Sequence, residues 1–157
     1  MLAAGTYLVP TLSALRNIVD NAGKGIPPYA VEKAERAADQ HRASVKMFYD
    51  AGGKIAMGTD SGTPFNIHGE NARELRFMVD VGMEPADALT AATSHGADLN
   101  QLPNRGRIAD GMVADLLMVS GNPLEDIDAV ADKANHRTVV KGGVVVAGGL
   151  AANLPVG

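Results

Sequence analysis

The longest periodic segment of the chain is residues 29–50, where apolar or small side chains recur every three or four positions. They are Val31, Ala34, Ala38, His41, Val45 and Phe48. Because this spacing puts them on one face of a helix, the pattern predicts an amphipathic helix that the glycine pair at 52–53 ends.

Two short apolar runs flank this predicted helix. The run at residues 6–9 is halted by a proline, which cannot donate a hydrogen bond to a neighbouring strand, and the second run follows the glycine pair directly. They predict strands at residues 5–12 and 54–59. Since a helix lies between them, this order is typical of an α/β unit with parallel, doubly covered strands. Residues 13–28 predict a turn-rich connection with a short helix at its start.

Three short helices are predicted after this unit. We expect them over residues 70–81, 85–92 and 94–99. Pro85 suits the first turn of the second helix, and Ser94 is a candidate cap for the third. A glycine at position 82 is a natural stop for the first.

The pattern changes at Pro103. From there to residue 147, short β-branched runs alternate with glycine turns, which predicts two or three strands of a small β-layer with a hairpin turn at Lys141-Gly142-Gly143. Residues 148–157 are rich in glycine and alanine and predict a loose tail. The expected division is therefore 1–102, 103–147 and the tail.

Composition narrows the classes of function. The chain has 157 residues, of which 46% are hydrophobic and 20% charged, as in a globular domain. A formal net charge of −4 without a basic block disfavours a nucleic-acid partner. No run approaches the roughly 20 apolar residues of a membrane span, and no signal-peptide pattern is visible, so we expect no membrane partner and favour a cytoplasmic location. Without cysteine, thiolate zinc sites and a cysteine nucleophile are excluded.

Asp60 is the first candidate for chemistry, because it stands at the C-terminal end of a predicted parallel strand. Folds of the α/β class place ligands and catalytic groups at that end. The alternative is that residues 59–62 only shape a turn, as Asp and Gly commonly do. Glu70 and Glu74 are expected on the first turns of a helix, where negative charge suits the helix dipole, with a catalytic glutamate as the lesser alternative. Structural or solvated roles are expected for His41, His95, His136, Lys46, Lys54 and Lys141.

Four segments together resemble the C-terminal part of the amidohydrolase superfamily. They are GTDSGTPFNIHGEN at 58–71, ELRFMVDVGMEPADALTAATSHGADL at 74–99, GRIADGMVADLLMVSGNPLEDI at 106–127 and VVKGGVVV at 139–146. The resemblance is to the branch of imidazolonepropionase-like and Xaa-Pro or Xaa-Arg dipeptidase-like metal hydrolases. It extends over nearly the whole chain, with the segments in the right order, and TYLVPTL at 6–12 is similar to the penultimate barrel strand of this branch.

The resemblance implies a fold, a cofactor and two site residues. The fold is the C-terminal portion of a (β/α)8 TIM-like barrel, with its last two strands at 6–11 and 54–59, followed by part of a small β-sandwich at 106–146. Asp60 is implied to contact the catalytic metal, to take the proton of the attacking metal-bound water and to pass it to the leaving amine. His68 is implied to bind substrate at the barrel mouth; a lone histidine in a loop is otherwise a surface residue. The expected cofactor is a divalent metal, zinc.

The other metal ligands of that family have no counterpart in this sequence. The family uses a His-x-His pair, a bridging lysine or acid and two further histidines, and no His-x-His occurs here. A catalytic zinc needs about three protein ligands, so we expect the chain alone not to hold the metal. A complete barrel needs roughly 250 residues. The expected partner is therefore a missing N-terminal barrel half, or a second copy through self-association.

Three functions follow from these patterns. The first is the C-terminal segment of a metal-dependent amidohydrolase that hydrolyses C–N bonds of a dipeptide, an acylated amino acid or a cyclic amide, and is inactive alone. The alternative is a non-catalytic, truncated remnant that acts as a structural or interaction module. Nucleotide or phosphate binding is disfavoured, because neither Walker nor dinucleotide spacing is present.

Overall fold

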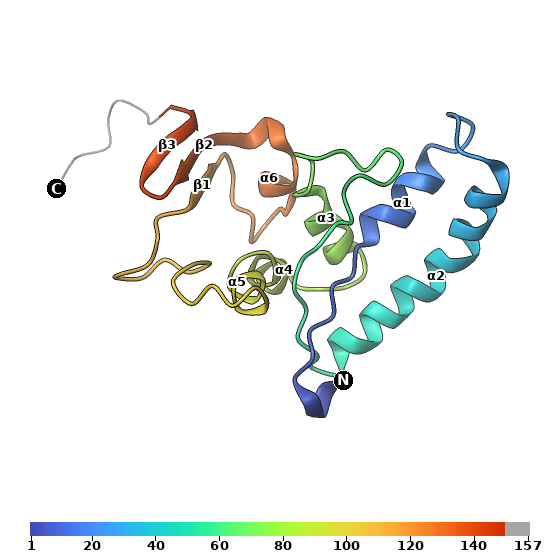
Figure 1. Cartoon of the computed structure of the whole chain (residues 1–157), viewed down its shortest axis with the longest axis horizontal. Helices are drawn as coiled ribbons and strands as arrows, with labels where there is room; N and C mark the ends of the chain where they lie inside the picture. Colours follow the sequence, from blue (N-terminus) through green and yellow to red (C-terminus); the bar gives the residue numbers. More distant parts are fainter. Residues whose placement is uncertain (150–157) are drawn as a thin grey trace.

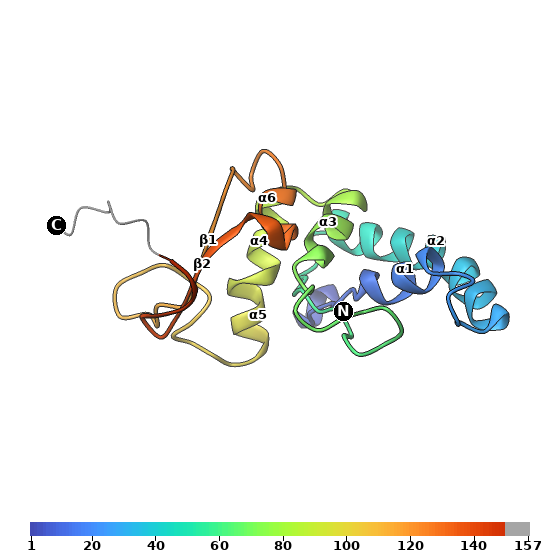
Figure 2. The same ribbon diagram turned by 90° about the horizontal axis from the view of Figure 1, so that it is seen from above.

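The protein is described by a computed structural model over residues 1–149; most of the predicted tail, from residue 150 on, lies outside the described residues. Figures 1 and 2 show an elongated arrangement with α1 and α2 at one end, a β-sheet at the other and the shorter helices between them. In chain order the elements are η1 (Leu2–Ala4), α1 (Leu12–Asp20), α2 (Pro28–Asp50), α3 (Arg73–Asp80), α4 (Pro85–Ala92), α5 (Ser94–Leu99), β1 (Leu116–Val119), α6 (Asp128–Ala131), η2 (Lys133–Asn135), β2 (His136–Lys141) and β3 (Val144–Gly148).

The two segments predicted as parallel strands lie side by side between the helices. They are joined by one parallel bridge, between Leu8 and Ile55. The Leu8 amide donates to the Lys54 carbonyl at 2.9 Å, and the Ala56 amide donates to the Leu8 carbonyl at 3.0 Å. The parallel pairing is thus confirmed, but the predicted extents of 5–12 and 54–59 are wrong as regular strands. The pairing is this short because Pro10 has no amide proton with which to extend it.

Groups from α4 and α5 bond the other edge of segment 54–59. The Met57 amide donates to the Ala91 carbonyl at 3.0 Å, and Nδ1 of His95 lies 2.8 Å from the Ile55 carbonyl oxygen. Two backbone groups on this edge, the Met57 amide and the Ile55 carbonyl, are therefore already bonded by groups of α4 and α5. A further strand that pairs with these two groups would have to share or displace these bonds.

The predicted helices are present, with local corrections. The helix expected at 29–50 is α2, whose first residue is Pro28, and Gly52 follows its end with φ of 73°. The helix expected at 70–81 begins only at Arg73. The predicted cap at Ser94 is wrong, because Ser94 is already helical and its hydroxyl bonds back to the Thr90 carbonyl at 3.5 Å.

The hydrophobic core lies where α1, α2, α3 and α4 meet the two parallel segments. Its buried members are Leu12, Val45, Ile55, Leu75, Met78, Val81, Met83, Ala88, Ala91, Ile127 and Ala131. The last two come from the region after Pro103, so the helical part and the β-layer share this core. Packing of apolar side chains from distant segments therefore holds the parallel pair in place.

The β-layer is an antiparallel sheet in the order β1-β2-β3. The hairpin turn predicted at Lys141-Gly142-Gly143 is confirmed; both glycines have positive φ, at 57° and 84°, which a glycine adopts without strain. No strand forms at residues 106–113, and the short α6 between β1 and β2 was not predicted. Every side chain of β1 except Val119 is exposed, as are all those of β3, so both faces of the sheet are incompletely covered. In residues 1–149 no helix is both long and apolar enough to cross a bilayer.

Candidate functional site

Asp60 lies immediately after the segment that pairs with residues 6–9. It is exposed, and its backbone is in the left-handed region with φ of 52°. Its carbonyl accepts hydrogen bonds, but in the described part of the chain its carboxylate makes none. A non-glycine residue held at positive φ is strained and persists only where its surroundings enforce it.

Asn66 is the residue that fixes this backbone from the following loop. The side chain of Asn66 is buried, and its Nδ2 donates to the Thr59 carbonyl at 2.5 Å and to the Asp60 carbonyl at 3.1 Å. One amide group therefore bonds two successive carbonyls around the strained residue. Such a contact supplies local hydrogen bonds in place of the strand pairing that ends here.

Helix α1 contacts the same backbone through one face. Oγ of Ser13 donates to the Thr59 carbonyl at 3.2 Å, and Nδ2 of Asn17 donates to Oδ1 of Asn66 at 3.3 Å. Ser13 and Asn17 are both buried and lie four residues apart, so they stand one above the other on the helix. The position of Asp60 thus depends on where α1 lies.

Asn71 closes the loop from its far end. Its Nδ2 donates to Oγ1 of Thr59 at 3.0 Å and to Oγ of Ser61 at 3.2 Å, while its Oδ1 accepts from the Gly69 amide at 3.0 Å. The two hydroxyls that flank Asp60 are themselves 2.8 Å apart. Polar side chains therefore hold both neighbours of Asp60, and its carboxylate is left free to act outward.

His68 is exposed and folds back over the start of the same loop. Its Nε2 lies 3.6 Å from the point where a Cβ on Gly62 would stand. This places the imidazole over a residue two positions from Asp60. The structure thus places the His68 imidazole beside Gly62, in the loop that follows Asp60.

Glu74 differs most from its predicted setting. Glu74 lies on the first turn of α3, as predicted, but its residue exposure is 0%. Oε1 accepts from the Leu12 amide and Oε2 from the Ser13 amide, each at 2.7 Å. Burial raises the pKa of Glu74, and the hydrogen bonds from Ser13 and Leu12 oppose this shift.

Two of the remaining histidines, His95 and His136, have structural contacts, as predicted. His95 bonds the Ile55 carbonyl and meets the Tyr7 ring edge to face, with ring centroids 5.6 Å apart. Nε2 of His136 lies 2.8 Å from the Val130 carbonyl oxygen. His41 lies on α2 and lines a cavity between α1, α2 and α3.

A metal site is not complete in these residues. Over residues 1–149, no three side chains of His, Cys, Asp or Glu come together as a possible metal site. A catalytic zinc takes about three protein ligands and keeps one open position. Asp60 offers a single unpaired carboxylate, so the donors present do not fit such a site by themselves.

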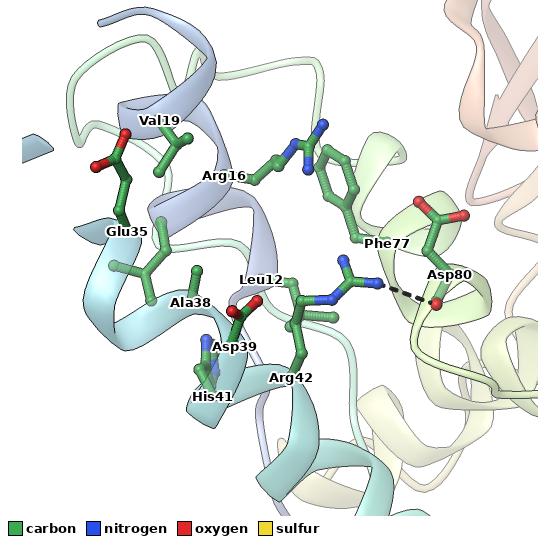
Figure 3. A pocket seen from close by; sticks show the side chains of 11 residues that line it. Leu12, Arg16, Val19, Glu35, Ala38, Asp39, His41, Arg42, Phe77 and Asp80 are labelled. Carbon is green, nitrogen blue, oxygen red and sulfur yellow. Dashed lines mark hydrogen bonds between the residues drawn. The ribbon is translucent and has the colours of Figure 1, made fainter. Parts of the chain in front are cut away.

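The cavity in Figure 3 does not belong to this site. It measures about 440 Å³ and is lined by residues of α1, α2 and α3, with Arg42 reaching across to the Asp80 carbonyl at 3.1 Å. Its α1 residues are Leu12, Leu15, Arg16 and Val19. These lie on a different face of the helix from Ser13 and Asn17, which contact the segment before Asp60.

Sequence reasoning predicted Asp60 and His68 as site residues but did not identify the residues that hold the backbone around Asp60. Asn66, Asn17 and Ser13 lie in or beside turn-rich stretches, where small polar residues are common and carry no distinctive spacing. The sequence gives no sign that Glu74 is buried, because it follows Arg73 at the start of α3. Its role depends on a contact 62 residues away, which no local pattern reveals.

Comparison with known proteins relates this chain to amidohydrolases in both sequence and structure. The model of the amidohydrolase family matches residues 1–146. Ochratoxinase of Aspergillus niger is 33% identical over 152 residues, a match that covers 94% of this chain and 31% of that protein.

Solved structures show the same likeness. A Xaa-Pro dipeptidase with methionine bound in its active site has a TM-score of 0.82 at 35% identity, over 93% of this chain and 36% of that one. A prolidase in complex with N-methylphosphonate-L-proline also has a TM-score of 0.82, at 32% identity, over 92% of this chain and 35% of that one. The chain therefore spans about a third of the length of the relatives that it matches.

Proposed function

The chain belongs to the amidohydrolase family, and on this premise we propose that it is a segment of a metal-dependent hydrolase of C–N bonds in which Asp60 is the general base. The observation that carries the proposal is the exposed carboxylate of Asp60, which makes no hydrogen bond in the described residues, on a backbone that Ser13 and Asn66 bond. Similarity to ochratoxinase and to the dipeptidases supports an amide or peptide-like bond as the one that is cleaved.

The chemistry assigned to this chain is a proton transfer. A carboxylate of Asp60 accepts the proton of the attacking water and then donates it to the nitrogen of the leaving amine, so that one group serves as base and then as acid. His68, on the same loop, is proposed to bind the substrate beside it. The relatives include two solved as a dipeptidase and a prolidase, so we propose a small dipeptide or acylated amino acid as substrate.

A divalent metal, zinc in our proposal, would lower the pKa of the attacking water when bound. Residues 1–149 supply at most Asp60 as a ligand, and the remaining donors have to come from outside these residues. We therefore propose that this chain alone neither holds the metal nor hydrolyses its substrate.

The fold proposed for the complete enzyme is a (β/α)8 barrel with a small β-sandwich. Residues 1–102 would contribute the last two barrel strands with their helices, and residues 103–147 the C-terminal strands of the sandwich. The parallel bridge between Leu8 and Ile55 supports the first part, and the antiparallel sheet supports the second. The bonds from Ala91 and His95 limit where a further barrel strand could join the 54–59 segment.

An open apolar cleft on the chain supports the proposal that a partner binds there. The cleft measures about 560 Å³ and lies between the helices and the sheet. Apolar members of its lining are Met57, Leu75, Leu89, Ile108, Leu116 and Leu117. Of these, Ile108, Leu116 and Leu117 are exposed. Exposed apolar surface favours association, and we propose that the missing barrel half, or a second copy of the chain, covers it.

The proposal is tested by complementation. The chain is co-expressed with the part of the Xaa-Pro dipeptidase relative that it does not cover, and the purified complex is assayed for zinc content and for release of free proline from Xaa-Pro dipeptides. We expect zinc and hydrolysis in the complex and neither in the chain alone. Asp60→Asn should lower kcat by about 100-fold or more, because general base catalysis contributes about that factor.

Asp110→Asn is the matched control, because Asp110 is an exposed carboxylate in a loop outside the site. It should leave hydrolysis unchanged. A folded complex in which Asp60→Asn is as active as the parent would refute the role of Asp60. A folded complex without any hydrolysis would favour the alternative, a non-catalytic module that kept the fold and lost the chemistry.

A further inference from the structure

Glu74 is a fully buried carboxylate that the proposed chemistry does not use. It is one of six buried polar or charged side chains in the described residues, and the others are Ser13, Asn17, Thr59, Asn66 and Thr138. Four of these five, all but Thr138, belong to the contacts around Asp60. Burying a carboxylate is costly unless its oxygens are well bonded, so its position calls for a physical reason.

The partners of Glu74 are the first free amides of helix α1. A helix leaves its first four N–H groups without intrahelical acceptors. The residue before α1, Thr11, provides no side-chain cap and has a left-handed backbone with φ of 46°. Glu74 supplies the missing acceptors from α3, with one oxygen for Leu12 and the other for Ser13, each at 2.7 Å. Its negative charge also suits the positive end of the helix dipole.

The first turn of α1 also contacts the candidate site. Ser13, whose amide Glu74 accepts, donates its own hydroxyl to the carbonyl of Thr59, the residue before Asp60. One turn later, Asn17 bonds Asn66, and Asn66 bonds the carbonyls of both Thr59 and Asp60. A continuous set of hydrogen bonds therefore runs from Glu74 through α1 to the strained backbone of Asp60.

We propose that Glu74 is a positioning residue: it fixes the start of α1 so that Ser13 and Asn17 hold the Thr59–Asp60 peptide and thereby set the direction of the Asp60 carboxylate. For its effect on catalysis the inference rests on the proposed function. It extends that function by assigning a role to a side chain that never reaches solvent, and it predicts that catalysis is sensitive to a residue without access to substrate.

The first test uses the chain by itself and needs no activity. Backbone amide resonances are assigned by NMR in the parent and in Glu74→Gln. The control variant is Glu84→Gln, which makes the same substitution at an exposed glutamate. We expect Glu74→Gln to shift the amide signals of Thr59, Asp60 and Ser61, and Glu84→Gln to leave them in place. Unchanged signals at these three residues in a folded Glu74→Gln protein would overturn the inference.

If Glu74→Gln does not fold, the variant Ser13→Ala tests the same route from α1 to Asp60. This variant leaves the α1 amides bonded to Glu74 and removes only the hydroxyl that reaches Thr59. The same three amide signals should move. If they stay in place in folded Ser13→Ala, the proposed route from α1 to Asp60 is wrong.

The second test uses the complemented hydrolase. Glu74→Gln should lower kcat by about 10- to 100-fold with little change in KM, because a small misplacement of a catalytic group has an effect of that order. A purely structural role would lower the amount of folded complex and leave kcat per folded site unchanged, and that result would refute the inference. If the parent complex shows no hydrolysis, the proposed function fails, whereas the NMR result still decides whether Glu74 positions Asp60.

Discussion

Burial of the single residue Glu74 opposes ionisation of its carboxyl group and makes the free energy of unfolding depend on pH. The folded protein holds the Glu74 proton more tightly than the unfolded chain, because burial raises its pKa above the ordinary value of 4.5. In the pH interval between the two pKa values, the native state therefore binds more protons than the unfolded state. The free energy of unfolding must then decrease as the pH rises through that interval.

We expect this dependence to disappear in Glu74→Gln, which does not titrate. Urea unfolding of the parent and the variant is compared from pH 4.5 upward past neutrality. The stability of the parent relative to the variant should fall with rising pH, by about 1.4 kcal/mol for every unit that separates the folded and unfolded pKa values. A difference that stays constant with pH would contradict the raised pKa.

At the scale of elements, the two parallel segments approach each other closely at Gly58. A Cβ at this position would lie 2.4 Å from Cγ1 of Val9, on the neighbouring segment. Valine is branched at Cβ and moves little about χ1, so an added methyl group has to separate the segments. The single bridge between Leu8 and Ile55 lies close to this contact.

Gly58→Ala should therefore destabilise the protein by about 1–3 kcal/mol, the usual effect of overpacking. The control is Gly96→Ala in α5, where a Cβ would meet only the Ala91 carbonyl oxygen at an ordinary 3.6 Å. That variant should be more stable than the parent by about 0.4–1 kcal/mol, because alanine restricts the unfolded chain. Denaturant midpoints measure both, and equal effects of the two substitutions would refute the close approach.

At the scale of the whole molecule, β3 combines exposed apolar side chains with a sheet edge that no other strand of residues 1–149 pairs. The side chains of Val144 and Val146 are 64% and 56% exposed, on a strand with one paired neighbour, β2. A sheet edge with apolar side chains is a template for association. We therefore expect the isolated chain to be of low stability or to self-associate.

The double variant Val144→Lys/Val146→Lys should shift the isolated chain toward monomer, because charge on an edge strand opposes pairing. Light scattering coupled to size-exclusion chromatography measures the mass at two concentrations. The control is Tyr29→Lys/Met47→Lys on α2, where the replaced side chains are 74% and 69% exposed but belong to no sheet. A parent that is monomeric with a sharp, high thermal transition would contradict the expectation.

The sequence by itself determined the main helices, the hairpin and the candidate carboxylate. Local patterns are enough for this, because the period of apolar residues selects α2. Glycine and proline mark where elements stop, and a carboxylate after an apolar run stands where α/β folds place ligands. The resemblance of four ordered segments to the amidohydrolases was likewise present in the sequence, and the family match over residues 1–146 confirms it.

The tertiary structure alone decided which side chains surround Asp60. Glu74, Ser13, Asn17 and Asn66 are brought together by contacts between residues 46 to 62 positions apart, and hydrogen bonds over such distances leave no periodic trace in the sequence. The structure also reduced two expected strands to one bridge, because backbone pairing depends on which groups lie alongside rather than on apolar composition. A carboxylate was recognisable from its neighbours in the chain, but the fold determined that one is buried and positions a helix while the other faces solvent.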